Sequence, residues 1–255
     1  MFSVLAHPLR IALALFSAFA VSYFMVPSVK RFAESVGGTD MPNARRINKV
    51  PVPRMGGIAI FCGFILSAIL FVDLTDQVKG ILIGSGIIAL MGAFDDVYNL
   101  TPWIKLAVQI GAAVVCVACG VVVDGITNFM ADGEMFFLSE PISILVTIIW
   151  IVGCTNAINL IDGVDGLAAG ICFVTLFTLG LAAAVRNQYL YMMITFGMLG
   201  ILLPFWCYNV FGKIERGNKI FMGDTGSLTL GYLVSFLLIT MASGSGVTFP
   251  SEMLV

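Results

Sequence analysis

Eight apolar runs separated by short polar segments determine what this chain can fold into. Each run has about 15–20 residues, enough to cross or nearly cross a bilayer as an α-helix. Charged residues make up only 11% of the 255 residues, about half of their share in a soluble domain. The sequence therefore predicts an all-α, polytopic transmembrane bundle of about eight helices, forming a single domain over residues 1–255. The runs are 11–29, 56–72, 80–94, 104–123, 142–158, 167–185, 189–207 and 226–242.

Positive charge is distributed unevenly on the two sides of these runs. Ten Lys and Arg residues fall in the segments 30–54, 95–105 and 208–222. The segments on the other side hold three: Arg10, Lys79 and Arg186. By the positive-inside rule the first set faces the cytoplasm, so we expect the N-terminus outside. The net charge of −2 gives no indication of nucleic-acid binding, and no nucleic-acid partner is expected.

The segment NAINLIDGVDGLAAG, residues 156–170, joins two apolar runs and is polar at every third position. These positions are Asn156, Asn159, Asp162 and Asp165. A glycine after each Asp favours a turn, which points two amides and two carboxylates into one small volume at the membrane boundary. Carboxylates there with no Lys or Arg nearby in the sequence need a cation. The alternative is a polar loop that only connects two helices.

The segment GAFDDVYNLTPWIKLAVQI, residues 92–110, places two adjacent carboxylates at the end of an uncharged run. Asp95 and Asp96 repel each other and face the negative end of the helix dipole. A hard divalent cation such as Mg²⁺, which binds one or two carboxylates together with substrate phosphate oxygens, would relieve both effects. Lys105 begins the next run, where it could hold a phosphate or merely extend its stem along apolar surface.

Two further segments suit phosphate binding. In DMPNARRINKVPVPRMGG, residues 40–57, Arg45, Arg46 and Arg54 supply cationic donors, although they also suit a plain positive-inside loop. Asp224 directly precedes the run 226–242. It suits either the N-cap of that helix or a metal ligand beside a phosphate at the helix N-terminus.

One arrangement accommodates all four segments. Carboxylates at the cytoplasmic membrane edge hold Mg²⁺, the metal and the basic residues hold a diphosphate, and a lipid with a charged head lies beside them. The residues therefore indicate phosphoryl transfer between a soluble nucleotide and a membrane lipid, by positioning and charge neutralisation.

With these residues in place, the chain resembles the polyprenyl-phosphate N-acetylhexosamine-1-phosphate transferases, which include the WecA and TagO enzymes and, more distantly, MraY. The resemblance spans about residues 37–235, and NLIDGVDG looks more like WecA and TagO than MraY. The matching motifs occur in family order: DMPNARR with PRMGG, FDDVYNLTPWIKLAVQ, NAINLIDGVDGLAAG and FMGDTGSLTLG.

The resemblance implies a reaction. A UDP-N-acetylhexosamine, expected to be UDP-N-acetylglucosamine, donates its sugar-1-phosphate to undecaprenyl phosphate, giving undecaprenyl-diphospho-sugar and UMP. This step starts a cell-envelope polymer. The implied cofactor is Mg²⁺, with Mn²⁺ as a substitute. The implied location is the bacterial cytoplasmic membrane, with the active site facing the cytoplasm, and a homodimer is the assembly suggested.

The resemblance also implies residue roles. Asp95 and Asp96 match the family's aspartate pair, one of which binds metal or deprotonates the lipid phosphate. The expected metal ligands are Asp96 and Asp224, the latter from the GD-x-G motif. Asp162 and Asp165 match catalytic residues near nucleotide and metal. Direct attack and a phospho-aspartate route both stay open. The expected substrate-binding residues are Asn159, Lys105, Arg45, Arg46, Arg54 and Asn209.

Two departures from the family pattern affect this interpretation. The family has His where this chain has Asn48. Members also have ten or eleven helices and a His-rich cytoplasmic loop after the eighth, whereas this sequence stops at Val255. The expectation is therefore a chain without the C-terminal part, which is either a fragment or a shortened member.

Three alternatives remain at the level of sequence. The first is a MraY-type enzyme that uses UDP-MurNAc-pentapeptide. The second is a cation-coupled transporter that uses Asp95, Asp96, Asp162 and Asp165, although transporters more often place polar groups near the bilayer midplane. The third is an inactive fragment with a structural or regulatory role.

Overall fold

The computed structural model describes residues 6–41, 50–127 and 135–243, and within them it contains eight α-helices and two short β-hairpins. The helices confirm the expected all-α bundle. Six of those described are long and apolar enough to cross a membrane, whereas α2 and α4 are shorter. The elements are α1 (His7–Val36), β1 (Thr39–Asp40), β2 (Val52–Pro53), α2 (Gly57–Phe71), α3 (Asp76–Tyr98), α4 (Pro102–Ala118), β3 (Gly125–Thr127), β4 (Met135–Phe137), α5 (Glu140–Ile161), α6 (Leu167–Val185), α7 (Tyr189–Val210) and α8 (Gly223–Ser243).

Local sequence explains where several helices end. The backbone of Gly37 is left-handed, with φ of +79°, and its N–H reaches the carbonyl of Ala33 to close α1. At the start of α3 the Thr75 side chain accepts a hydrogen bond from the N–H of Val78. The same helix ends at Tyr98 and is followed by the C-cap Asn99, whose backbone is also left-handed. In each hairpin the two strands pair antiparallel.

Helix α8 forms the centre of the bundle. About 89% of its apolar span is buried, compared with 17% for α5, so α8 is enclosed by protein and α5 presents most of its surface outward. It packs mainly on α3 and α5 and also contacts α2 and α6. Glycines allow the closest of these approaches. A Cβ added to Gly57 would lie 2.0 Å from the backbone N of Gly226.

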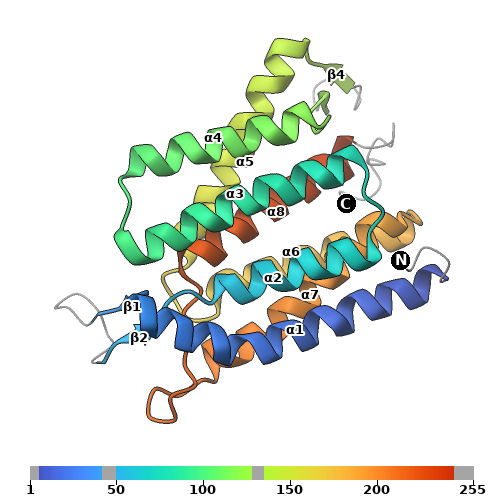
Figure 1. Cartoon of the computed structure of the whole chain (residues 1–255). Helices are drawn as coiled ribbons and strands as arrows, with labels where there is room; N and C mark the ends of the chain where they lie inside the picture. The colour runs from blue at the N-terminus through green and yellow to red at the C-terminus, as the bar shows by residue number, and fades with distance from the viewer. Residues whose placement is uncertain (1–5, 42–49, 128–134, 244–255) are drawn as a thin grey trace.

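The helices alternate in direction, so every second connection lies at the same end of the bundle (Figure 1). The β1–β2 hairpin and the connections α3–α4, α5–α6 and α7–α8 share that end. The described part of the chain thus places the four polar segments together, as the orientation argument predicts. We call it the polar end.

The structure corrects some boundaries predicted from the sequence. The expected run 80–94 is part of the longer helix α3, so Asp95 and Asp96 lie in its last turn. Helix α8 begins at Gly223, so Asp224 lies inside its first turn and does not precede the helix. The predicted residues Arg45 and Arg46, and Asn48, fall outside the described residues.

Candidate active site

A cluster of two carboxylates and one ammonium lies at the polar end. Lys105, at the start of α4, places its Nζ 2.5 Å from Asp95 Oδ2 and 2.7 Å from Asp224 Oδ2. The three side chains come from α4, α3 and α8. About a quarter of the Lys105 and Asp224 side chains is exposed, whereas the Asp95 side chain is 7% exposed. Lys105 therefore does more than extend along apolar surface, because it forms ion pairs with two acids from other helices.

Asn159 on α5 joins this cluster from the opposite side. Its Nδ2 donates to Asp224 Oδ1 at 3.1 Å and to Ser227 Oγ at 2.8 Å. Asp224 therefore receives an ammonium on one carboxylate oxygen and an amide on the other. Ser227 was not among the residues predicted from the sequence. Its position one turn after Asp224 in GDTGS could have indicated it, since residues three apart share a helix face.

Asp96 has a different environment from Asp95. Its Oδ1 accepts the backbone N–H of Asp224 at 2.9 Å. Its Oδ2 accepts the N–H of Thr225 at 3.1 Å and the Thr225 hydroxyl at 2.6 Å. Asp96, and not Asp224, therefore caps helix α8, which rules out the N-cap interpretation of Asp224. The Asp96 side chain is only 2% exposed.

Arg54, which directly follows β2, packs its side chain against the C-terminus of α3. Its Nε donates to the backbone carbonyl of Asp96 at 2.9 Å, and its Nη2 donates to the Asn99 side chain at 2.9 Å. These contacts satisfy carbonyl and amide groups at the helix C-terminus. The structure thus gives this predicted substrate-binding residue a definite packing role.

The loop between α5 and α6 carries the third motif. Asp165 is paired with Lys219, whose Nζ lies 2.6 Å from Asp165 Oδ2 and also donates to the backbone carbonyl of Asn209. Asn209 accepts the N–H of Gly166 at 2.6 Å and donates to the carbonyl of Ile220 at 3.0 Å. Asn209 is buried, and both ends of its amide bind backbone groups. It therefore holds the loop in place within the described structure.

Asp162, in the same loop, has no hydrogen-bond donor among the residues that the structure describes. Burial raises the pKa of Asp162 to about 7, and the negative charges of Asp224, Asp96 and Asp165 raise it as well. Carboxylates that raise one another's pKa in this way gain most from a nearby cation. When it is ionised, Asp162 adds negative potential to the cluster.

Among the described residues, no group of three or more His, Cys, Asp or Glu side chains is arranged to hold a metal. Two carboxylates, however, already share one cation, the Lys105 ammonium. Because Mg²⁺ commonly uses one or two carboxylates and completes its shell with water and phosphate oxygens, Asp95 and Asp224 fit this ion. Asp96 fits it less well, because three hydrogen bonds occupy its carboxylate.

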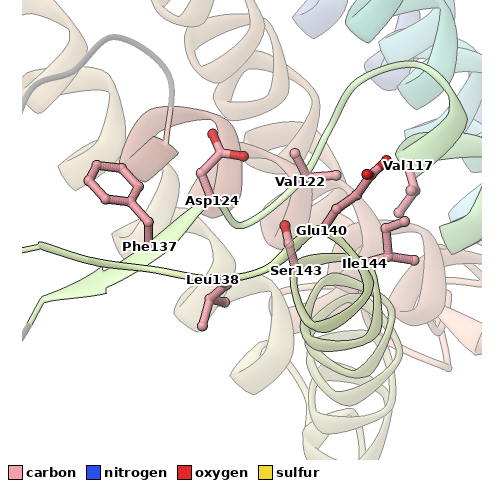
Figure 2. Close-up of a pocket in the computed structure, with 8 residues that line it drawn as sticks. All are labelled: Val117, Val122, Asp124, Phe137, Leu138, Glu140, Ser143 and Ile144. Carbon is pink, nitrogen blue, oxygen red and sulfur yellow. The ribbon is translucent and has the colours of Figure 1, made fainter.

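A separate pocket of about 380 Å³ lies at the other end of the bundle, between the end of α4, the β3–β4 hairpin and the start of α5 (Figure 2). Asp124 and Glu140 are its charged lining residues. None of the predicted site residues lines it, so it is distinct from the cluster at the polar end.

Comparison with known proteins supports the motif analysis. The family model for glycosyl transferase family 4 matches residues 78–242, more than half of the chain. The chain belongs to glycosyl transferase family 4. This confirms the family that the four motifs indicated, and the matched region of this family 4 protein runs from α3 to α8.

Curated relatives of this family 4 protein include three differently named bacterial enzymes. A probable undecaprenyl-phosphate N-acetylglucosaminyl 1-phosphate transferase of Bacillus subtilis is 36% identical over 90% of this chain and 62% of the relative. A decaprenyl-phosphate N-acetylglucosaminephosphotransferase of Mycobacterium tuberculosis is 32% identical over 92% and 61%. A phospho-N-acetylmuramoyl-pentapeptide-transferase of Streptococcus thermophilus is 29% identical over 88% and 70%. The chain spans about three fifths of the length of the first two.

Proposed function

We propose that this protein transfers an N-acetylhexosamine-1-phosphate, expected to be GlcNAc-1-phosphate, from a UDP-sugar to a polyprenyl phosphate. Undecaprenyl phosphate is the acceptor we expect. An oxygen of the lipid phosphate bonds to the sugar-linked phosphorus of the donor, and the bond from that phosphorus to the bridging oxygen of the diphosphate breaks, which releases UMP. The names of the relatives support this reaction type.

The Asp95–Lys105–Asp224 cluster is the observation that carries the proposal. It combines one ammonium with two carboxylates, which a phosphate and a metal ion could bind in place of each other. It lies at the end of the bundle where water, a nucleotide and a lipid head group can meet. Lys105 would hold phosphate oxygens once they compete for its ammonium, and Asp95 would orient or deprotonate the lipid phosphate. Asn159 would keep Asp224 aligned. Mg²⁺, held by Asp95 and Asp224, would supply neutralisation of the diphosphate charge.

The site's place in the bundle also bears on the transporter alternative. Inverted-repeat transporters usually bind their cargo near the bilayer midplane, at discontinuous helices. Here the charged cluster lies at one end of the bundle, and Lys105 forms ion pairs with two of its acids. We therefore infer group transfer at a membrane surface, and we propose that this surface faces the cytoplasm, where UDP-sugars are made.

The test is release of UMP by the full-length protein in detergent with UDP-GlcNAc and undecaprenyl phosphate, in Mg²⁺ and in EDTA. We expect metal-dependent UMP and a lipid-linked sugar. Asp95→Asn should lower turnover about 100-fold or more, because it removes charge at the reacting groups without changing shape. Release only with UDP-MurNAc-pentapeptide would assign the protein to the MraY type. No release with either donor would contradict the proposal.

A further inference from the structure

The two adjacent aspartates at the end of α3 point to different neighbours. Asp95 Oδ2 faces Lys105, within the cluster, and Asp95 Oδ1 accepts the N–H of Leu100 at 2.6 Å. Asp96 turns away from Lys105 and directs both oxygens at the first turn of α8. Neighbouring residues on a helix point about 100° apart, so one pair can serve two sites.

The contact between Asp96 and α8 is favourable for the N-terminus of α8 and for the Asp96 carboxylate. The first N–H groups of a helix lack partners within the helix, and the helix dipole makes this end positive. Asp96 binds the N–H groups of Asp224 and Thr225, so it caps α8 from a different helix. Its own position, at the negative C-terminal end of α3, is unfavourable without such a partner. The positive end of α8 offsets this penalty, and so does the Arg54 guanidinium, whose Nε lies 3.9 Å from Asp96 Oδ1.

Gly223 gives independent support for the close contact between Asp96 and the first turn of α8. Its φ is +73°, and an added Cβ would lie 1.7 Å from the Arg54 carbonyl and 2.6 and 2.7 Å from the Asp96 carboxylate oxygens. The chain therefore passes the carboxylate at a distance that only glycine permits. The Arg54 side chain also contacts Asp96, because its Nε donates to the Asp96 backbone carbonyl and lies 3.9 Å from Asp96 Oδ1.

The position of Asp224 depends on this cap. Asp224 lies in the first turn of α8, and its own N–H is one of the groups that Asp96 holds. Any shift of that turn would move the Asp224 carboxylate relative to Lys105, Asn159 and Asp95.

We propose that Asp96 is a positioning residue: it caps α8 from α3 and thereby holds Asp224 against Lys105, and it does not itself bind the metal. This inference rests on the proposed transferase function only where activity is measured. It divides the roles of the aspartate pair, because Asp95 faces the reacting groups and Asp96 places Asp224. It also removes Asp96 from the predicted metal ligands.

The test is a double-mutant cycle of Asp96→Asn and Thr225→Val in the full-length protein. Thr225 has no carboxylate, touches Asp96 through its hydroxyl, and is buried. Asp96→Asn leaves one acceptor oxygen where there were two and should lower the melting temperature by about 2–4 °C, whereas Thr225→Val removes only the hydroxyl bond and should lower it by less. The double variant should be little worse than Asp96→Asn, because Thr225→Val then removes a contact that Asp96→Asn has already weakened. Thr225→Ser keeps the hydroxyl and should recover most of the loss.

Activity and metal response provide the readout that a purely structural role would not give. Per folded molecule, Asp96→Asn and Thr225→Val should both lower kcat with unchanged KM for UDP-GlcNAc, and because both displace Asp224 they should shift the half-saturating Mg²⁺ alike. Mg²⁺ should still raise the melting temperature of Asp96→Asn as it does that of the wild type.

Two results would overturn the inference. One is additive losses of melting temperature in the double variant. The other is an Asp96→Asn protein that needs at least about tenfold more Mg²⁺ while Thr225→Val does not, a difference of about 1.4 kcal/mol in metal binding. If the wild type releases no UMP, the transferase proposal fails, and the thermal cycle still decides the cap. If Asp96→Asn does not fold, Thr225→Val and Thr225→Ser carry the test.

Discussion

Two acidic groups of the candidate site are paired with lysines from other elements of the folded protein. Asp224 meets Lys105, which is 119 residues away, and Asp165 meets Lys219, which is 54 residues away. A partly buried charge without such a partner would lower the stability of the fold. The protein therefore supplies its own cations to the cluster, and a metal would have to compete with an ammonium for Asp95 and Asp224.

Lys105→Met tests this competition, because it removes the charge and keeps the apolar stem. Without Mg²⁺ the variant should lose about 1–3 kcal/mol, less than a fully buried pair because a quarter of the lysine is exposed. Mg²⁺ should then raise the melting temperature more in the variant than in the wild type, because the ion relieves repulsion between unpaired acids. Thermal unfolding across a Mg²⁺ series measures both effects.

Lys79→Met is the matched control for Lys105→Met. Lys79 pairs with Asp76 at the other end of α3, and both side chains are largely exposed. Its loss should change stability little, with no effect on the response to Mg²⁺. Equal Mg²⁺ responses in Lys105→Met and the wild type would argue against a shared cation site.

Asp162 and Asp165 lie in one loop, and their amide variants should have opposite effects on stability. Burial raises the pKa of Asp162 from 3.8 to about 7. Between about pH 4 and 7 the folded protein therefore keeps a proton that the unfolded chain has lost, and stability falls as the pH rises through this window. Asp162→Asn stays neutral, so it should raise the melting temperature at pH 8 and change it little at pH 4.

Asp165→Asn removes the partner of Lys219 and should lower the melting temperature at both pH values. Thermal unfolding in EDTA at pH 4 and pH 8 distinguishes the two variants. A lower melting temperature for Asp162→Asn at pH 8 would mean that its carboxylate has a stabilising partner when ionised.

At the scale of the elements, the start of α8 is wedged between α2 and α3. Gly57 on α2 and Gly92 on α3 both face the first turn of α8, and a Cβ on Gly92 would lie 2.5 Å from the Thr225 Cα. Backbone atoms cannot move aside as a flexible side chain can. These glycines thus set the depth at which α8, and with it Asp224, lies in the bundle.

Gly92→Ala should therefore destabilise the protein by at least about 1–3 kcal/mol and lower activity, because it pushes α8 away from α3. Gly86→Ala on the same helix is the control, since its Cβ would meet only the Phe61 ring at 3.7 Å. It should be neutral or stabilising by up to about 1 kcal/mol, as alanine favours helix. Thermal unfolding and UMP release measure both variants. A neutral Gly92→Ala would contradict the tight contact.

At the scale of the whole molecule, the ends of the bundle differ in how their basic residues are used. At the polar end, Lys105 and Lys219 pair with acids of the candidate site. At the opposite end, Arg10 is buried and binds Asp73 and the carbonyl of Phe71, where it ties α1 to the end of α2. Arg10 therefore has a structural role.

The orientation can be measured by labelling introduced cysteines with a membrane-impermeant maleimide in wall-stripped cells. Asp76→Cys, at the start of α3, should be labelled in intact cells. Glu215→Cys, in the exposed α7–α8 connection, should be labelled only after the membrane is opened. The unsubstituted chain provides the background from its six native cysteines. The reverse pattern would place the candidate site outside the cell.

The sequence by itself determined the helices and the end of the bundle where the polar segments gather. Length and hydrophobicity are enough to predict a spanning helix, and successive spans must alternate in direction. Asp95, Asp224 and Asn159 could therefore be assigned to one membrane edge before any packing was known. The family followed from four motifs in order, which does not require a tertiary contact.

Only the tertiary structure decided how these residues are paired. Helices that are apolar on nearly every side do not show which face points inward, because periodicity requires contrast between faces. The sequence therefore could not show that Lys105 bridges Asp95 and Asp224, that Asn209 is occupied by backbone groups, or that Asp96 caps α8. These contacts join segments far apart in the chain, and they depend on the close packing that Gly57 and Gly92 permit.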